Sequence, residues 1–252
     1  MITLTLRTAL AEALEFDGIL PERVAGLSEN EIAALPVWLA GRELQVGELF
    51  TVRGQRSAHL RIEGDLTRAS RVGAGLSGGR LDVVGNVGDD AGMAMTGGVL
   101  TISGNAGDRL CAATPGAAKG MTGGEAIVFG AAGSETGARA RRGLIVVGGD
   151  AGAQTARDII AGTVVVFGCT GPEPGRRSKR GSIVAVGGID VPSTYRFACT
   201  YEPPYVRLLM TYLRRTYGLP VGDDVISGRY RRYCGDLGDP GKGEILIRSR
   251  SA

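Results

Sequence analysis

The sequence has a single histidine, His59, among its 252 residues, so it offers little for acid–base or metal chemistry. A mononuclear metal site draws on several His, Cys or carboxylate ligands, and a Ser–His or Cys–His nucleophilic site would need this one imidazole. His59 opens a strand-like segment, and we interpret it as a strand-end or surface histidine. We therefore predict no catalytic residue and no metal site in this chain.

The sequence also lacks C-x-x-C pairs and long apolar segments. The four cysteines, at positions 111, 169, 199 and 234, include no C-x-x-C pair, which argues against a zinc ribbon, an iron–sulfur cluster or a disulfide scaffold. The N-terminal segment lacks the features of a signal peptide, and no 18-residue apolar segment occurs. We expect reduced thiols and a cytoplasmic protein.

Aromatic residues are scarce at 5%, whereas the chain contains 42 glycines. That glycine share is more than twice the usual value of about 7%. The formal net charge of +3 is too small to indicate nucleic-acid binding by itself. A core poor in rings and rich in Gly, Val, Ile and Ala favours thin, tightly turned layers over a helix bundle.

Short apolar segments that end in glycine recur through the middle of the chain. They are LRIEG at 60–64, LDVVG at 81–85, LTISG at 100–104, AIVFG at 126–130, LIVVG at 144–148, VVVFG at 164–168 and IVAVG at 183–187. A second glycine column precedes the strands with a step of 19 residues, apart from one insertion near 112–119. A period near 20 indicates an internal repeat of the solenoid type.

Only about 12 residues separate successive strands, and they show no helical apolar period, so a βαβ crossover is disfavoured. We predict an all-β fold, a right-handed parallel β-helix, with a short α/β N-terminal region and a helical C-terminal segment. The predicted domains are 1–57 for the N-terminal strands and helix, 58–190 for the repeat, and 191–252 for the C-terminal segment. In the first of these, Ser28 and Glu31 match a helix capping box.

Alternation along each strand predicts which side chains point inward. Counting back four and two residues from the closing glycine assigns Leu144 and Val146 to the interior, for example. The opposite positions become apolar after the insertion, and more apolar area faces outward than a monomer usually exposes. We predict burial of this outer face against the C-terminal helix or a partner subunit. The interface residues are Ile127, Phe129, Ile145, Val147, Val165 and Phe167.

Two local motifs are better explained by structural roles than by ligand binding. Gly73-Ala-Gly75-Leu-Ser-Gly78 matches G-x-G-x-x-G, but a strand follows it where a dinucleotide site needs a helix. Acidic residues follow the closing glycines and could bind calcium, but capping of turn N–H groups is the favoured role. These acids are Asp65, Asp89, Asp90, Asp108 and Asp150.

Basic residues recur with the repeat, so stacking would bring them onto one edge as a strip. This basic strip consists of Arg139, Arg141, Arg142, Arg157, Arg176, Arg177, Lys179 and Arg180. It could bind a polyanion, an anionic carrier tail or an acidic partner surface, or it could be a solvated corner. Farther on, Pro203 and Pro204 precede an amphipathic helical pattern that Gly218 ends, a candidate lid over the apolar outer strands.

Several segments resemble a known family. The glycine-rich stretches at 85–98, 104–107 and 120–124 resemble the GXGXG repeat domain that also closes the large subunit of glutamate synthase. The pieces YEPPYVRLLM at 201–210 and YCGDL at 233–237 resemble the C subunits of formylmethanofuran dehydrogenases and of the bacterial formyltransferase/hydrolase complex of one-carbon metabolism.

The resemblance implies a non-catalytic structural subunit. Its partners would be an amidohydrolase-like A subunit, a B subunit and a formyltransferase D subunit, and the metals would lie in partner subunits rather than in this chain. The complex would move a formyl group from formyl-tetrahydromethanopterin to a methanofuran-type carrier and hydrolyse it to formate. This chain would bind no cofactor by its own motifs, although the carrier could contact it. The alternatives are the C subunit of a tungsten or molybdenum formylmethanofuran dehydrogenase, a glutamate-synthase-like enzyme domain, and a stand-alone polyanion-binding module.

Overall fold

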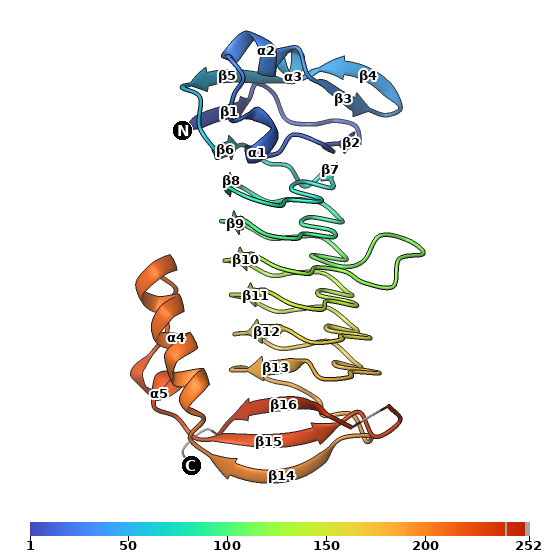
Figure 1. Cartoon of the computed structure of the whole chain (residues 1–252), viewed down its shortest axis with the longest axis vertical. Coiled ribbons are helices and arrows are strands. Elements are labelled where there is room, and N and C mark those ends of the chain that lie inside the picture. Colours follow the sequence, from blue (N-terminus) through green and yellow to red (C-terminus); the bar gives the residue numbers. More distant parts are fainter. Residues whose placement is uncertain (240, 250–252) are drawn as a thin grey trace.

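The computed structural model describes residues 1–239 and 241–249, and most of its strands join one large sheet (Figure 1). The strands of this sheet are β1 (Ile2–Leu6), β5 (Phe50–Gly54), β6 (His59–Glu63), β8 (Arg80–Val84), β9 (Val99–Ile102), β10 (Glu125–Val128), β11 (Leu144–Val147), β12 (Thr163–Val166), β13 (Ser182–Ala185), β14 (Arg196–Tyr201), β15 (Tyr230–Gly235) and β16 (Gly243–Arg248). Their order is β14-β15-β16-β13-β12-β11-β10-β9-β8-β6-β1-β5.

The N-terminal residues add a small sheet and three short helices at one end of the molecule (Figure 1). The small sheet contains β2 (Leu14–Glu15), β3 (Pro36–Leu39), β4 (Arg42–Gln45) and β7 (Ala69–Ser70), and the helices are α1 (Pro21–Val24), α2 (Glu29–Ala33) and α3 (Val46–Leu49). The predicted capping box is confirmed, since Ser28 and Glu31 satisfy each other's backbone N–H groups at the start of α2.

Each of the seven predicted strand segments forms a strand, and the strands from β6 to β13 pair in parallel. The turns after the strands contain left-handed backbone at regular spacing. Non-glycine residues with positive φ recur at Arg71, Asp90, Arg109, Glu135, Gln154 and Glu173. Two residues after the first of these, Gly73 has φ +71°, and Gly75 has φ +74°. The glycine-rich motif at 73–78 is therefore a turn, where glycine adopts positive φ without steric cost.

The main core lies between the sheet and the segments that return from one strand to the next. Leu81 and Val83 of β8 belong to it, and so do Leu110 and Met121 from the return segments. All four are at most 1% exposed. Isolated parallel bridges, such as those joining Ala132 to Ala106 and Ala151, link the return segments to one another.

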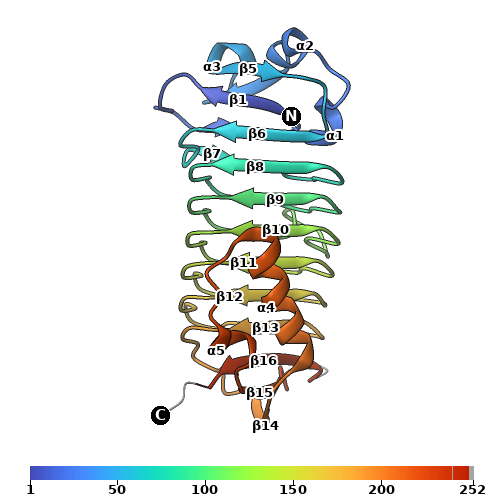
Figure 2. The ribbon, with the colours of Figure 1, turned by 90° about the vertical axis from the view of Figure 1, so that its left-hand side faces the viewer.

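The C-terminal residues form both strands and helices. Helix α4 (Pro204–Tyr217) is followed by α5 (Asp223–Ile226), and α4 lies across the strands from β10 to β13 (Figure 2). Gly218 ends α4 with φ +68°, the left-handed conformation typical of a helix C-terminus. The strand β16 then pairs in parallel with β13, and β15 and β14 follow in antiparallel pairing.

The predicted all-β, right-handed parallel β-helix with a helical C-terminal segment is wrong as the fold class. The chain forms a mixed α/β structure whose dominant element is a 12-stranded sheet. Segments outside the repeat enter that sheet: β1 pairs with β6 in parallel and with β5 antiparallel. The segment 191–252 contributes three strands beside α4 and α5. Glycine spacing reports where strands recur, but distant segments add to the sheet because its edges have free backbone groups.

The division at residues 57 and 190 stays a prediction. Among the described helices, none is both long and apolar enough to cross a membrane.

Candidate interaction surfaces

His59 lies beside a carboxylate on the outer face of the early strands. Its Nε2 atom is 2.6 Å from Oδ2 of Asp82, which also accepts a hydrogen bond from Arg80 Nε at 3.0 Å. Burial opposes ionisation of Asp82, but hydrogen bonds from Arg80, Thr101 and His59 hold the pKa of its carboxyl below the usual value. Asp82 is thus an ionised partner for these neighbours, and His59 is a half-exposed residue at the start of β6.

The buried thiol of Cys111 is not a nucleophile candidate, because burial raises its pKa. Within residues 1–239 and 241–249, no group of three or more His, Cys, Asp or Glu side chains could hold a metal ion.

Four of the five acids that follow the strands cap turns, as predicted, whereas Asp90 accepts its hydrogen bonds from the Arg109 side chain. Asp89 Oδ1 accepts from the backbone N–H of Asp108 at 2.9 Å, and Asp108 Oδ1 accepts from Ser134 N–H at 2.7 Å. Asp150 does the same for Cys169 N–H at 2.7 Å. The carboxylates of Asp89, Asp108 and Asp150 each satisfy a donor in the next repeat, so they stabilise the stack.

The outer face of the later strands forms a second hydrophobic cluster beneath α4. From the sheet it contains Ile127, Val146, Val165, Val184 and Leu246, and from α4 it contains Val206, Met210 and Leu213. Each of these side chains is fully buried. Helix α4 buries this apolar face, and Figure 2 shows the helix on it.

The six predicted interface residues are not all on this face. Ile127 and Val165 are buried beneath α4, and Phe167 packs at the margin of the same cluster. Phe129 is 38% exposed, so this chain does not provide its predicted burial. Its cover by a partner stays a prediction.

The outward assignment of Ile145 and Val147 is wrong, because both side chains lie in the main core. The strand β11 pairs Ile145 with Ala126 and Val147 with Val128, so Val146 is the outward residue. The prediction takes Gly148 as the closing glycine of this strand, whereas Gly149 occupies that place and its N–H donates to Gly130 O at 2.8 Å. A slip of one residue reverses every side chain of a strand.

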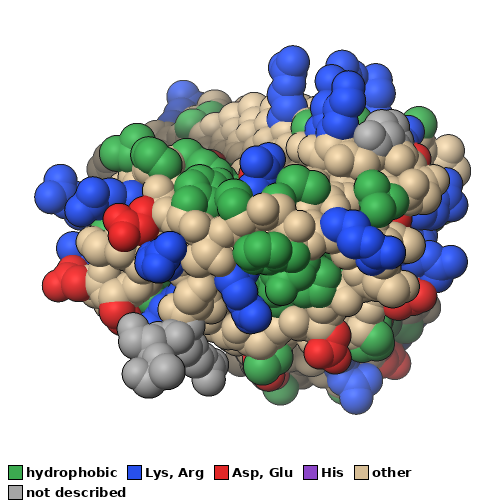
Figure 3. All heavy atoms as spheres, turned by 90° about the horizontal axis from the view of Figure 1, so that it is seen from below, with side chains coloured by type: hydrophobic (Ala, Val, Ile, Leu, Met, Phe, Trp, Pro, Cys, Tyr) green, Lys and Arg blue, Asp and Glu red, His purple; other side chains and the backbone are tan. Residues whose placement is uncertain are grey.

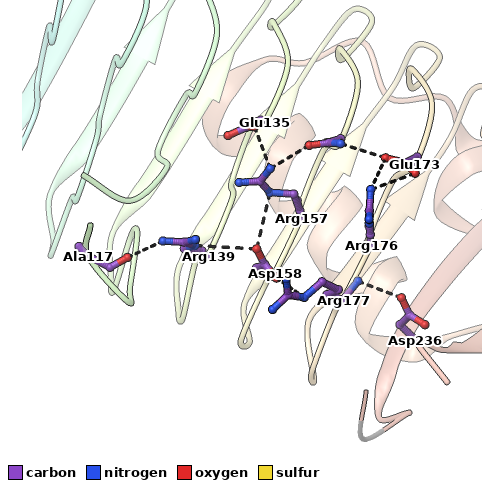
Figure 4. A network of polar contacts seen from close by, with 10 residues as sticks. Ala117, Glu135, Arg139, Arg157, Asp158, Glu173, Arg176, Arg177 and Asp236 are labelled. Atoms are coloured by element: carbon purple, nitrogen blue, oxygen red, sulfur yellow. Dashed lines mark hydrogen bonds and ion pairs between the residues drawn. The ribbon is translucent and has the colours of Figure 1, made fainter. Parts of the chain in front are cut away.

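The basic strip divides into a paired half and an unpaired half, and Figure 4 shows the paired half. Asp158 is the centre of the paired half. Its carboxylate lies 3.0 Å from Arg177 Nε, 3.6 Å from Arg157 Nε and 3.8 Å from Arg139 Nε. The Asp158 side chain is only 16% exposed, so one carboxylate offsets much of the charge of three guanidinium groups.

Two further acids complete this network. Glu135 Oε1 lies 3.1 Å from Arg157 Nη1, and Glu173 Oε2 lies 2.9 Å from Arg176 Nη1. Sequence reasoning missed these acids because it counted only cations. A search at the same period finds Asp158, which lies 19 residues after Arg139 and 19 before Arg177.

The unpaired half, named here the basic quartet, consists of Arg141, Arg142, Lys179 and Arg180. All four residues are exposed, and none forms an ion pair with a described residue. Arg142 and Arg180 precede β11 and β13, two strand spacings apart, which is about 10 Å. The quartet is therefore the part of the strip whose charge is free to act on another molecule.

The fold and these surfaces define a sheet protein built from repeats. Most of its polar clusters stabilise its own turns, whereas the basic quartet and Phe129 are exposed. No protein-family model matches the chain. The C subunit of the formyltransferase/hydrolase complex Fhc of Methylorubrum extorquens is 41% identical over 88 residues, 35% of this chain and 33% of that protein. The C subunit of molybdenum-containing formylmethanofuran dehydrogenase 1 of Methanosarcina barkeri is 33% identical over 92 residues, 34% of this chain and 31% of that protein.

These alignments span about a third of the length of either curated relative. The structural similarity extends over the whole chain. A chain in the X-ray crystal structure of the formyltransferase/hydrolase complex FhcABCD from Methylorubrum extorquens, in complex with methylofuran, superposes with a TM-score of 0.84. That chain is 36% identical, and the match covers 98% of this chain and 100% of that one. The protein belongs to the family of C subunits shared by formyltransferase/hydrolase and formylmethanofuran dehydrogenase complexes.

Proposed function

We propose that this chain is the structural C subunit of a formyltransferase/hydrolase complex. The end-to-end superposition on a chain of the Methylorubrum extorquens complex, at 36% identity, carries this proposal. In such an assembly an amidohydrolase-like subunit and a formyltransferase subunit perform the chemistry: transfer of a formyl group from formyl-tetrahydromethanopterin to a methanofuran-type carrier and its hydrolysis to formate. The assembly belongs in the cytoplasm, in keeping with four cysteines that are all free.

The proposal is tested by purifying the tagged chain from its own cells. We expect it to co-purify with A, B and D subunits, and we expect the eluate to form formate from a formylated carrier. A chain that elutes alone, without this activity, contradicts the proposal.

The alternative assembly is a molybdenum-containing formylmethanofuran dehydrogenase, whose C subunit from Methanosarcina barkeri is 33% identical over 92 residues. The two differ in chemistry, since the dehydrogenase is a redox enzyme and the other complex is hydrolytic. Elemental analysis of the purified assembly separates them: stoichiometric molybdenum or tungsten supports the dehydrogenase.

The basic quartet has a place in this function. We propose that it anchors the anionic, glutamate-containing tail of the carrier. Guanidinium groups bind carboxylates in a bidentate fork, and three of the four quartet residues are arginines. The paired arginines around Asp158 are less suited, because neighbouring acids already occupy them.

A further inference from the structure

The two edge strands of the 12-stranded sheet differ, because one is covered by helices and the other is not. At one edge, β5 packs against α2 and α3, which cover it, and Phe50 and Val52 are buried. At the other edge, β14 pairs with β15 on one side, and no described strand pairs with its other side. Four consecutive residues of β14, 196–199, are exposed, whereas the strands of the repeat bury alternate residues or more.

An uncovered edge strand presents a row of free N–H and C=O groups, and soluble proteins usually block such rows. In β14 the block is partial: Arg196 is its one charged residue, and its pairing with β15 shifts register between Phe197 and Cys199. Phe197 is 56% exposed, and its ring lies edge-to-face with the Tyr233 ring at a centroid distance of 5.7 Å. Seen from this end, hydrophobic side chains lie among Lys and Arg side chains (Figure 3). An exposed aromatic residue with arginine neighbours is typical of an interface core rather than of a terminal repeat with a polar outer face.

A hollow continues from the end of this strand. A cavity of about 260 Å³ begins at Glu202, the residue after β14, and lies between the start of α4 and the end of α5. Leu208 and Ile226 line it, and Leu208 is 72% exposed. The free edge thus leads directly to a place that can receive an apolar side chain.

We propose that the free edge of β14 accepts a strand from another protein subunit, one whose joining segment is acidic and carries an apolar side chain for the hollow at Leu208. Main-chain hydrogen bonds extend the sheet, and acidic side chains face Arg196 and Arg231. The proposal rests on the proposed function, which supplies the A, B and D subunits as donors of that strand.

The charge of the edge selects this partner over a second copy of the chain. The sequences of β14 and β15, RFACTY and YRRYCG, contain no acid. Of their three arginines, Arg232 is paired with Glu244 of β16 at 2.8 Å, whereas Arg196 and Arg231 have no ion-pair partner among the described residues. Two copies joined edge to edge would bring these arginines together with no carboxylate from either strand to offset them. An acidic strand removes that repulsion and pairs the same groups.

The test uses the chain co-expressed with the A, B and D subunits of its own organism. The variants are Phe197→Asp and Arg196→Glu, both at exposed positions. The matched controls are Trp38→Asp and Arg42→Glu at the opposite end, where Trp38 is 45% exposed. We expect each β14 variant to bind the other subunits at least about tenfold more weakly than wild type, and the controls to bind normally. Hydrogen exchange at residues 196–199 should slow on assembly.

Four outcomes are distinguishable. Normal assembly of both β14 variants, or unchanged exchange of the β14 amides on assembly, overturns the edge proposal and leaves the proposed function standing. A free chain that is already dimeric, with protected β14 amides, also overturns the edge proposal in favour of self-pairing. A wild-type chain that fails to join the A, B and D subunits overturns the proposed function, and the edge proposal with it.

Discussion

The hydroxyl of Tyr217 donates a hydrogen bond to Oε2 of Glu125, which connects the last residue of α4 to the first residue of β10, 92 positions earlier in the chain. Tyr212 donates to the same carboxylate atom at 2.9 Å. Burial, together with the hydrogen bond to Glu125, raises the pKa of Tyr217, so its hydroxyl stays protonated as a donor. The pair fixes the far end of α4 on the sheet.

We predict that Tyr217→Phe lowers the free energy of unfolding by about 1.5 to 3 kcal/mol, the usual contribution of a hydrogen bond to a charged group. Chemical denaturation measures it. The control is Tyr233→Phe, since the Tyr233 hydroxyl has no hydrogen-bond partner among the described residues. Equal stability of the two variants would show that the hydrogen bond from Tyr217 to Glu125 does not stabilise the chain.

Substitution by Asp should have different effects at a position buried beneath α4 and at an exposed position. Val165 is fully buried, so Val165→Asp leaves an unpaired charge in the cluster and costs more than about 3 kcal/mol. Phe129 is 38% exposed, so Phe129→Asp should leave the isolated chain folded and impair assembly. Urea unfolding and size-exclusion chromatography of the co-expressed subunits measure the two effects. A fully assembled Phe129→Asp complex would exclude a partner at this position.

The closing glycine of β8 is predicted to be irreplaceable. Gly85 has φ +144°, and a Cβ atom there would lie 2.0 Å from the carbonyl oxygen of Gly64. Gly85→Ala should cost more than about 2 kcal/mol, because the backbone of the neighbouring repeat must move. Gly78→Ala is the control, since a Cβ atom at that position would meet nothing within 4 Å and its φ is ordinary. Similar melting temperatures for both variants would contradict the close packing of these repeats.

Removing the basic quartet tests carrier anchoring. In an intact complex, replacing Arg141, Arg142, Lys179 and Arg180 by Ala should raise the KM for the carrier at low salt and have less effect at high salt, where exposed charges are screened. Arg176→Ala with Arg177→Ala is the matched control, because Glu173 and Asp158 already offset those charges. An unchanged KM at both salt concentrations, with assembly intact, would show that the quartet is solvated and does not bind the carrier.

The carboxyl of Asp82 should contribute to acid sensitivity. Its pKa is lower in the folded chain than its ordinary value, because hydrogen bonds from Arg80, Thr101 and His59 outweigh burial. Its stabilising effect is therefore present above the ordinary pKa of an Asp and is lost as the pH falls through the folded value. Asp82→Asn should make the free energy of unfolding less dependent on pH below about 4. If the free energy of unfolding of wild type and variant depended on pH in the same way in acid, Asp82 would make no such contribution.

Much of the local structure follows from the sequence, because it depends on neighbouring residues. The strand segments recur about every 20 residues with their glycines, apart from one insertion, and the capping box at Ser28 and Glu31 is satisfied within a few positions. The capping role of Asp89 and Asp108 also follows from their place after each strand. The pieces at 201–210 and 233–237 were enough to indicate the family.

The tertiary structure decided what depends on pairing between distant segments. The outward place of Val146 follows from its pairing with Ile127, because hydrophobic residues fill both faces of β11 and their pattern does not reveal the register. The strands β1 and β16 lie outside the repeat and join the sheet by pairing with β6 and β13. The repeat pattern does not predict these pairings, and therefore it does not predict the mixed α/β fold. The paired half of the basic strip exists because folding places Asp158 within reach of three arginines, while Arg142 and Arg180 remain free.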